Sequence, residues 1–256
     1  MSDSPMTDRP HDPGRAASSA AFSPLYQQIK SLILRGLDHG EWKPGEAIPS
    51  EFELAARYQV SQGTVRKAID ELAADNLLIR RQGKGTFVAT HNEAKVRFRF
   101  LRLSADDGLP AASRSQILDC RRLKAPPEVA GALDMRTGDM VVNMRRVLSF
   151  DAIPTILDDI WLPGHIFKGL TMESLERYRG PVYALFETEF GVSMVRADEK
   201  IRAVIATSAQ AELLSVPVSS PLLQVERISY TYGDRPMELR RGLYVTERYH
   251  YRNSLN

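Results

Sequence analysis

Cysteine is nearly absent from this sequence, which has one, Cys120, in 256 residues. A single cysteine excludes an internal disulfide and any zinc finger built on cysteines. Zinc binding through histidine is not supported either, because no two of the five histidines stand three or four residues apart, as ligands on one helix would. We therefore expect no metal and no cofactor.

Long apolar runs are also missing. No stretch approaches the roughly 18 apolar residues of a membrane-spanning helix, and the first residues lack the apolar segment of a secretory signal. We expect a cytoplasmic protein without a membrane partner. Residues 1–21 are rich in serine, proline, aspartate and alanine without periodicity, which is typical of a disordered tail.

No large excess of either charge is present. The formal net charge is +2, and 26% of the residues are charged. This balance excludes a nonspecific polycation, so any contact with nucleic acid has to come from a local patch. The apolar share of 43% is enough to build a core, and the length allows one large domain or two modest ones.

Helical patterns dominate the first third of the chain. Residues 24–40 carry apolar side chains at helical spacing. Ser50 and Glu53 form an S-x-x-E capping box for a second helix over residues 51–58, and Ser61 can cap a third helix. Because a turn of only two or three residues separates the last two helices, they predict a helix-turn-helix.

A hairpin is predicted directly after these helices. Residues 77–81 and 86–89 are β-like, and the loop between them contains two glycines. This hairpin has the place and length of the wing in a winged helix. The first domain thus covers about residues 22–90, and the polar stretch 91–97 is expected to be a linker.

The third helix should turn its apolar face inward and present polar side chains from its first turns. Arginine can bind guanine edges and glutamine adenine edges, while glycines allow a sharp wing tip to follow phosphates or enter the minor groove. The residues that we expect to contact double-stranded DNA are Ser50, Ser61, Gln62, Thr64, Arg66, Lys67, Arg81, Gly83, Lys84, Gly85 and Thr86.

The charge of this domain is small for a DNA-binding domain. Residues 22–91 carry nine Lys and Arg against eight Asp and Glu, a net charge of +1. Affinity must therefore come from segregation of the charges over the surface, and two copies in a homodimer would add to it.

The period of the pattern changes in residues 98–256. Strand-like runs are expected at 97–103, 115–123, 140–149, 153–161, 194–206, 221–231 and 237–249, and helices at 126–133, 181–190 and 208–215. Several strands follow one another without regular alternation with helices. The second domain is therefore predicted to be α+β with a mainly antiparallel sheet.

Motif runs in the first domain resemble the GntR family of bacterial transcription regulators. These runs are Leu25-Tyr26-Gln27-Gln28-Ile29, Pro44-Gly45, Ile48-Pro49-Ser50-Glu51, Glu53-Leu54-Ala55, Tyr58, Val60-Ser61, Thr64-Val65-Arg66-Lys67-Ala68 and Gln82-Gly83-Lys84-Gly85-Thr86-Phe87-Val88. The resemblance implies that Arg66 contacts DNA and that the wing tip lies in the minor groove. Many members have arginine where this chain has Phe52 and Gln62, which implies an operator that differs from the commonest family sequence.

The second domain resembles the UTRA effector-binding domain of the HutC-type branch of that family. The matching residues are Arg145-Arg146, Pro154, Trp161-Leu162-Pro163, Val182-Tyr183-Ala184-Leu185, Phe190-Gly191-Val192, Pro236-Met237-Glu238-Leu239-Arg240, Tyr244 and Arg248-Tyr249. The resemblance implies a fold related to chorismate lyase that binds a small anionic or polar effector between sheet and loops. It places the following residues at effector-lining positions: Arg146, Asp158, Glu238, Arg240 and Tyr244.

An arginine offers a planar fork to the carboxylate or phosphate of a metabolite. By the same resemblance, Pro181 and Leu148 replace a phosphate-contacting serine and a second arginine of members that sense sugar phosphates. These replacements favour a smaller, carboxylate-type effector over a phosphorylated one.

These features predict a ligand-responsive regulator that represses transcription and binds a pseudo-palindromic operator as a dimer, nucleoid-associated while on DNA. An enzyme of the lyase or hydrolase type is an alternative based on fold kinship alone, without a recognisable acid, base or nucleophile. A DNA-binding protein without an effector is another alternative, although the second domain is larger than dimerisation needs.

Overall fold

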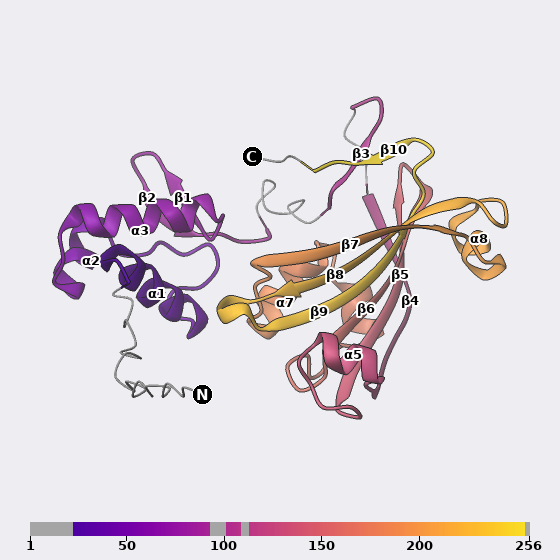
Figure 1. Cartoon of the computed structure of the whole chain (residues 1–256), viewed down its shortest axis with the longest axis horizontal. Helices are drawn as coiled ribbons and strands as arrows, with labels where there is room; N and C mark the ends of the chain where they lie inside the picture. Colours follow the sequence, from indigo (N-terminus) through magenta and orange to yellow (C-terminus); the bar gives the residue numbers. More distant parts are fainter. Residues whose placement is uncertain (1–22, 93–100, 109–112, 254–256) are drawn as a thin grey trace, which may run out of the picture.

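The computed structural model describes residues 23–92, 101–108 and 113–253. It shows a helical domain with a small hairpin and a larger domain built on one sheet, lying side by side (Figure 1). The expected tail, residues 1–21, lies outside the described residues, as do residues 93–97 of the expected linker.

The first domain begins with α1 (Leu25–Asp38), α2 (Glu51–Tyr58) and α3 (Gln62–Ala74). The capping box starts α2 where the sequence predicts it, because Ser50 Oγ accepts from the Glu53 backbone N–H at 3.2 Å and Glu53 Oε2 accepts from the Ser50 N–H at 2.8 Å. Ser61 caps α3 in the same way through the backbone N–H of Thr64. The apolar faces of the three helices meet in one core, with Ile33, Leu54 and Val65 fully buried.

The wing consists of β1 (Leu78–Arg81) and β2 (Gly85–Val88), which pair antiparallel. Gly83 and Gly85 at its tip have φ angles of 70° and 103°. Other residues rarely adopt such angles, so the glycines allow the tight turn. Together with the helices, this hairpin confirms the predicted winged helix-turn-helix.

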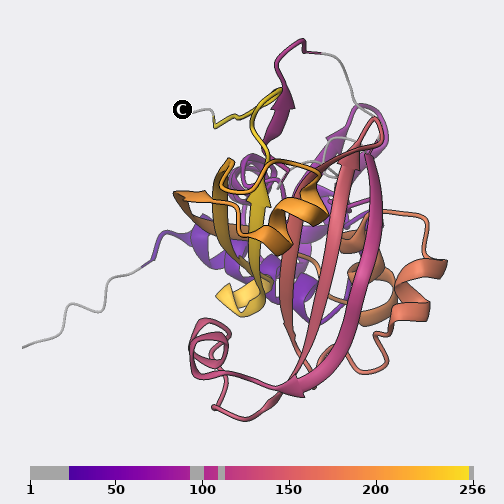
Figure 2. The same ribbon diagram turned by 90° about the vertical axis from the view of Figure 1, so that its right-hand side faces the viewer.

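Six long strands form the sheet of the second domain (Figure 2). Their order is β4-β5-β6-β9-β8-β7, and every neighbouring pair is antiparallel. The bounds are β4 (Ser113–Lys124), β5 (Met140–Phe150), β6 (Ile153–Pro163), β7 (Arg196–Ile205), β8 (Pro221–Tyr230) and β9 (Pro236–Tyr244). The predicted α+β class with a mainly antiparallel sheet is therefore confirmed.

Helices cover both faces of this sheet. The face that bears Met144 and Ile160 packs against α6 (Met172–Arg177) and α7 (Val182–Phe190). The opposite face packs against α5 (Pro127–Ala132) and α8 (Ser208–Leu214). One turn of 3₁₀ helix, η1 (Tyr232–Asp234), lies in the connection between β8 and β9. Neither α6 nor η1 was predicted from the sequence.

The expectation of one strand over residues 237–249 is wrong. β9 ends at Tyr244, and a separate strand β10 (Tyr249–Tyr251) pairs with β3 (Leu103–Ala105) in a second, two-stranded sheet. Both short strands pack their apolar side chains on one end of the main sheet, against Phe150 and Ile156. An alternating pattern alone does not show where a chain leaves one sheet for another.

Candidate functional site

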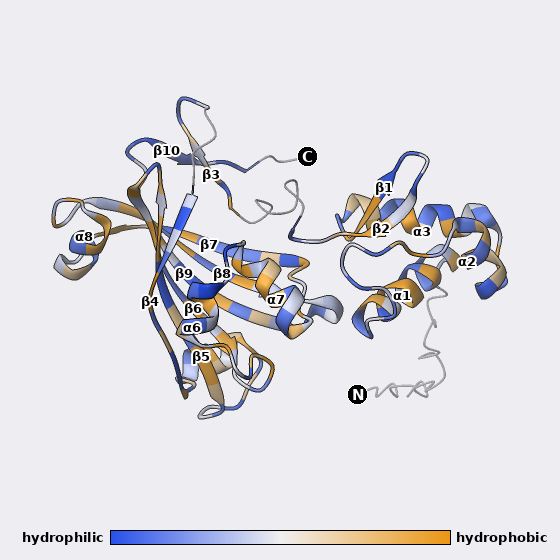
Figure 3. Ribbon diagram, turned by 180° about the vertical axis from the view of Figure 1, so that it is seen from behind, coloured by the Kyte–Doolittle hydropathy of each residue, from blue (hydrophilic) through white to orange (hydrophobic). Residues whose placement is uncertain are grey.

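The first candidate site is the surface formed by the start of α3, the start of α2 and the wing. Of the residues predicted to contact DNA, Thr64 and Thr86 are half-buried and the others are exposed. The wing tip is among the most hydrophilic parts of the domain (Figure 3). The apolar side chains of α3 are turned into the core, as predicted.

Glu51 connects the parts of this surface. Its Oε2 accepts from Arg66 Nε of α3 at 2.9 Å, and its Oε1 accepts from Arg80 Nη1 of the wing at 2.9 Å. Arg80 also donates to Asp70 Oδ1 through Nη2 at 2.7 Å. One carboxylate on α2 therefore holds an arginine of the third helix and an arginine of the wing in fixed positions.

The charged state of Glu51 is favoured in this arrangement. Partial burial acts against the carboxylate, but hydrogen bonds from Arg80 and Arg66 outweigh it and lower the pKa of Glu51 below its usual value. The Arg66 side chain remains 58% exposed. It is thus oriented by Glu51 and still accessible to a partner.

Several of the predicted contact residues have a structural role as well. The hydroxyls of Ser50 and Ser61 cap α2 and α3. The ammonium of Lys67 lies over the ring of Tyr26 at 3.9 Å from its centroid, and the guanidinium of Arg81 lies over Phe87 at 4.3 Å. These cation–π contacts limit the freedom of two basic side chains on the surface.

The second candidate site lies in the sheet, on the face covered by α6 and α7. Here the strand register places Arg146 opposite Asp158 and Asp158 opposite Gly242, and it pairs Ser229 with Glu238 and Arg227 with Arg240. The five residues predicted to line an effector site therefore come together. All are almost fully buried, with exposed fractions between 0% and 8%.

Six charged residues in this region form what we call the charge cluster: Arg146, Asp158, Glu199, Arg227, Glu238 and Arg240. Arg146 donates through Nε and Nη2 to Asp158 Oδ2 at 3.0 and 2.8 Å. Arg240 binds Glu238 with two parallel hydrogen bonds of 3.0 Å and lies 3.5 Å from Asp158 Oδ2. Three positive charges are thus matched by three negative ones.

One atom of the cluster is not satisfied. Asp158 Oδ1 is buried and accepts no hydrogen bond from the residues that the structure describes. Burial raises the cost of the Asp158 charge, but the charges of Arg240 and Arg146 outweigh it and lower the pKa of this carboxyl. Asp158 is therefore an anion with one oxygen available to a donor, in a place where an unsatisfied acceptor costs free energy.

Sequence reasoning missed further members of this site. The hydroxyl of Tyr183 on α7 donates to Glu238 Oε1 at 2.8 Å, and Ser229 lies 3.1 Å from it. Arg227 binds Glu199 at 2.6 Å, and Glu199 also accepts from Tyr251 of β10. Two signals in the sequence were available. Tyr183 belongs to a motif that resembles the UTRA domain, and Arg227 interrupts the apolar alternation of its strand.

The short strands β3 and β10 cover one end of the charge cluster. Tyr251 contacts Tyr244 edge-on, with ring centroids 6.4 Å apart. Burial and the Asp158 charge raise the pKa of Tyr244 to about 12, so its hydroxyl stays protonated at neutral pH. β3 and β10 pair with each other in a sheet of their own and contact the main sheet through packed side chains. They thus form a separate layer over the site.

Two further observations concern the described part of the chain. Among these residues, no group of three His, Cys, Asp or Glu is arranged to hold a metal ion. None of the helices that the structure describes has the length and apolar character needed to cross a bilayer.

The chain matches two family models. Residues 25–88 match the model described as bacterial regulatory proteins, gntR family, and residues 110–250 match the UTRA domain. The second match alone spans more than half of the chain. The two matches coincide with the two domains that carry the candidate sites.

Named relatives align with this chain over most of their length. The histidine utilization repressor of Pseudomonas putida is 29% identical over 89% of this chain and 90% of its own length. The mannosyl-D-glycerate transport/metabolism system repressor MngR of Escherichia coli K12 is 28% identical over 89% of this chain and 94% of its own.

Solved structures agree with the fold. A ligand-binding domain of a regulator assigned to the GntR family in Bordetella bronchiseptica is 61% identical, with a TM-score of 0.59, over 62% of this chain and 98% of that one. PhnF from Mycobacterium smegmatis is 25% identical, with a TM-score of 0.52, over 89% of this chain and 99% of that one.

Regulators of this family bind DNA operators, and UTRA domains bind small-molecule effectors. The protein is accordingly a ligand-responsive DNA-binding regulator of transcription and not an enzyme. On this evidence, the chain belongs to the GntR family of bacterial regulatory proteins, as a member that joins a winged helix-turn-helix to a UTRA domain.

Proposed function

We propose that this regulator is a repressor that binds a pseudo-palindromic operator as a homodimer and responds to a small anionic metabolite bound at the charge cluster. The observation that carries the proposal is the buried Asp158, which is held as an anion by two arginines while its Oδ1 has no donor among the described residues. The repressor names of the relatives support the sign of regulation.

The chemistry of the cluster favours one kind of effector. Each arginine already has an acidic partner, so an anion alone would have to displace a buried carboxylate. A ligand with an anionic group and a hydroxyl or ammonium group could bind an arginine and donate to Asp158 Oδ1 at once. The 3.5 Å contact between Arg240 and Asp158 is the longest pair in the cluster, and it is where we place the ligand.

A thermal-shift screen of the full chain tests this site. The screen compares three sets of compounds: simple carboxylates, the corresponding hydroxy and amino acids, and phosphorylated sugars. A ligand that prefers the native state raises the stability of that state, which the assay measures as a higher melting temperature. We expect the second set to raise the melting temperature, and we expect Arg146→Gln to abolish the shift. Arg145→Gln is the control, since Arg145 pairs with Asp159 instead. A shift retained in Arg146→Gln would reject the site.

The DNA surface is tested separately. An operator is first selected from random-sequence duplexes with the full chain. Arg66→Ala should then weaken binding to the selected duplex by about 1–3 kcal/mol. Arg35→Ala, which removes an exposed arginine from the last turn of α1, should have little effect. Sedimentation with and without the duplex determines whether two copies bind one site.

A ligand that weakens operator binding must itself bind less tightly to the DNA-bound protein, because linkage is reciprocal. The direction of the coupling follows from one titration of the selected duplex with and without the ligand found in the screen. If the operator is bound more tightly in the presence of the ligand, the ligand promotes DNA binding instead of releasing the protein from DNA.

A further inference from the structure

His91 was expected in a polar linker, but it is 2% exposed and packs against the second domain. Its backbone N–H donates to Glu187 Oε2 at 3.0 Å, and its Nε2 lies 3.0 Å from the carbonyl oxygen of Met194. Its ring meets the ring of Tyr183 edge-on, with centroids 5.2 Å apart. The chain leaving the wing is therefore anchored on α7 before the remainder of the linker begins.

Tyr183 also contacts two members of the charge cluster. Its hydroxyl donates to Glu238, and the guanidinium of Arg240 lies 5.3 Å from its ring centroid. Tyr183 is 7% exposed. One aromatic ring thus touches the linker residue His91 and two members of the charge cluster.

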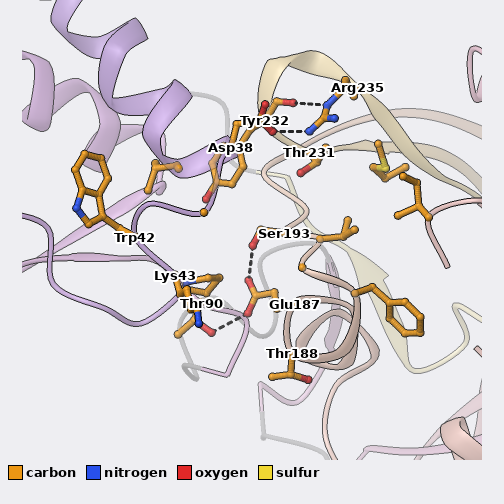
Figure 4. A pocket seen from close by; sticks show the side chains of 18 of the residues that line it. Asp38, Trp42, Lys43, Thr90, Glu187, Thr188, Ser193, Thr231, Tyr232 and Arg235 are labelled. Carbon is orange, nitrogen blue, oxygen red and sulfur yellow. Dashed lines mark hydrogen bonds and ion pairs between the residues drawn. The ribbon is translucent and has the colours of Figure 1, made fainter. Parts of the chain in front are cut away.

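The same helix holds the linker at a second point. Glu187 lies four residues after Tyr183, which places both on one face of α7. Its carboxylate accepts from Thr90 Oγ1 at 2.8 Å and from Ser193 Oγ at 3.2 Å, besides the His91 N–H (Figure 4). A change in the position of α7 therefore reaches Thr90 and His91 directly.

The connection between β8 and β9 provides another contact between the domains. Tyr232 is 8% exposed and belongs to the apolar core of the first domain, and Arg235 forms an ion pair with Asp38 of α1 (Figure 4). Ser229 and Glu238, on the two strands that this connection joins, are both hydrogen-bonded to Tyr183. The first domain is thus held at two places, each adjoining the charge cluster.

Between these two places the domains do not pack closely. A cavity of about 600 Å³ lies there, lined by Trp42 and Lys43 of the first domain and by Thr188 and Phe190 of the second. Around this cavity the joint rests on the anchors described above and on the packing of Tyr232 and Val195 against the first domain.

We propose that Tyr183 couples the charge cluster to the linker, so that a change in its hydrogen bond to Glu238 loosens the anchoring of Thr90 and His91 on α7. The inference rests on the proposed effector site and adds to it the route by which that site acts on the DNA-binding domain. An effector that engages Glu238 or Arg240 competes with Tyr183 and alters the freedom of the first domain.

Amide hydrogen exchange on the full chain, without effector or DNA, tests the coupling. Tyr183→Phe removes only the hydroxyl, and we expect exchange at the His91 amide to rise on the order of tenfold, since a hydrogen bond to a charged acceptor is lost. Tyr251→Phe is the matched control, because it removes another hydroxyl that donates to the cluster at Glu199 but makes no contact with His91. An unchanged His91 amide in Tyr183→Phe, or an equal rise in both variants, would overturn the proposal.

A second variant excludes a general folding defect. Thr90→Val removes the hydroxyl, directly before the linker, that binds Glu187, and it leaves the cluster intact. Since coupling is reciprocal, exchange should rise in residues 182–187 of α7 but not in β4 and β5. No change in α7 would contradict the proposal. Because the test needs no ligand, a failed effector screen leaves this result standing, and a failed coupling test leaves the effector site standing.

Discussion

Arg66 of α3 is paired with Glu51 of α2, through a hydrogen bond of 2.9 Å from Nε to Oε2. The pairing places a negative charge on the surface that we assign to DNA, where an acid lowers the attraction to phosphates. Since Glu51 also holds Arg80 of the wing, the benefit lies in orientation. An arginine whose position is fixed before binding loses less side-chain entropy when the complex with DNA forms.

The first prediction concerns Glu51→Gln. Binding to random-sequence duplex should become tighter, because one negative charge is lost, while binding to the selected operator should weaken by about 1–2 kcal/mol, because Arg66 and Arg80 lose their charged anchor. Fluorescence anisotropy at several salt concentrations measures both. Glu71→Gln makes the same charge change beside Lys30 and should leave the ratio of the two affinities unaltered. If Glu51→Gln bound both duplexes more tightly, the result would argue against an orienting role of Glu51.

The second prediction concerns Gly242, opposite Asp158 in the sheet. A Cβ at this position would lie 2.6 Å from the ring of Tyr244 and 2.9 Å from Asp158 Oδ1. Gly242→Ala should therefore lower the free energy of unfolding by about 1–3 kcal/mol, as overpacking of a buried site does. Gly131→Ala in α5 meets open space and should be neutral or stabilising by up to about 1 kcal/mol. Chemical denaturation measures the free energy of unfolding of both variants. Equal changes in the two variants would contradict the crowded geometry around Gly242.

The third prediction concerns Cys120 of β4. Burial and the Asp119 charge raise the pKa of its thiol to about 11. The thiolate is the reactive form, so alkylation by iodoacetamide should be slow at pH 7 and should accelerate about tenfold per pH unit up to about pH 11. A Cys120→Ser variant gives the background rate. A plateau near pH 8.5, the usual pKa of a free thiol, would contradict the raised pKa of this half-buried residue.

How far the sequence predicts the structure depends on the range of the interactions. The start of α2 follows from Ser50 and Glu53, which act on adjacent backbone groups, and the wing follows from its two glycines. The burial of His91 does not, since it depends on Glu187, almost a hundred residues later in the chain. Likewise, the pairing of Arg227 with Glu199 depends on the register of β7 and β8. The residues that we expect to line the effector site follow from family resemblance, and only the sheet shows that their charges balance.

The last prediction concerns Phe52, the most exposed large apolar side chain of the described residues at 75%. It follows Glu51 at the start of α2, and a solvent-exposed ring here gains nothing for folding. Phe52→Arg should strengthen binding to random-sequence duplex and increase the salt dependence of the association constant by about one phosphate contact. Phe52→Ala should leave that salt dependence unchanged and weaken binding only to the selected operator, where the ring is available for apolar contact with a thymine methyl group. If neither variant alters DNA binding, Phe52 lies outside the interface, and the DNA then contacts α3 and the wing without the start of α2.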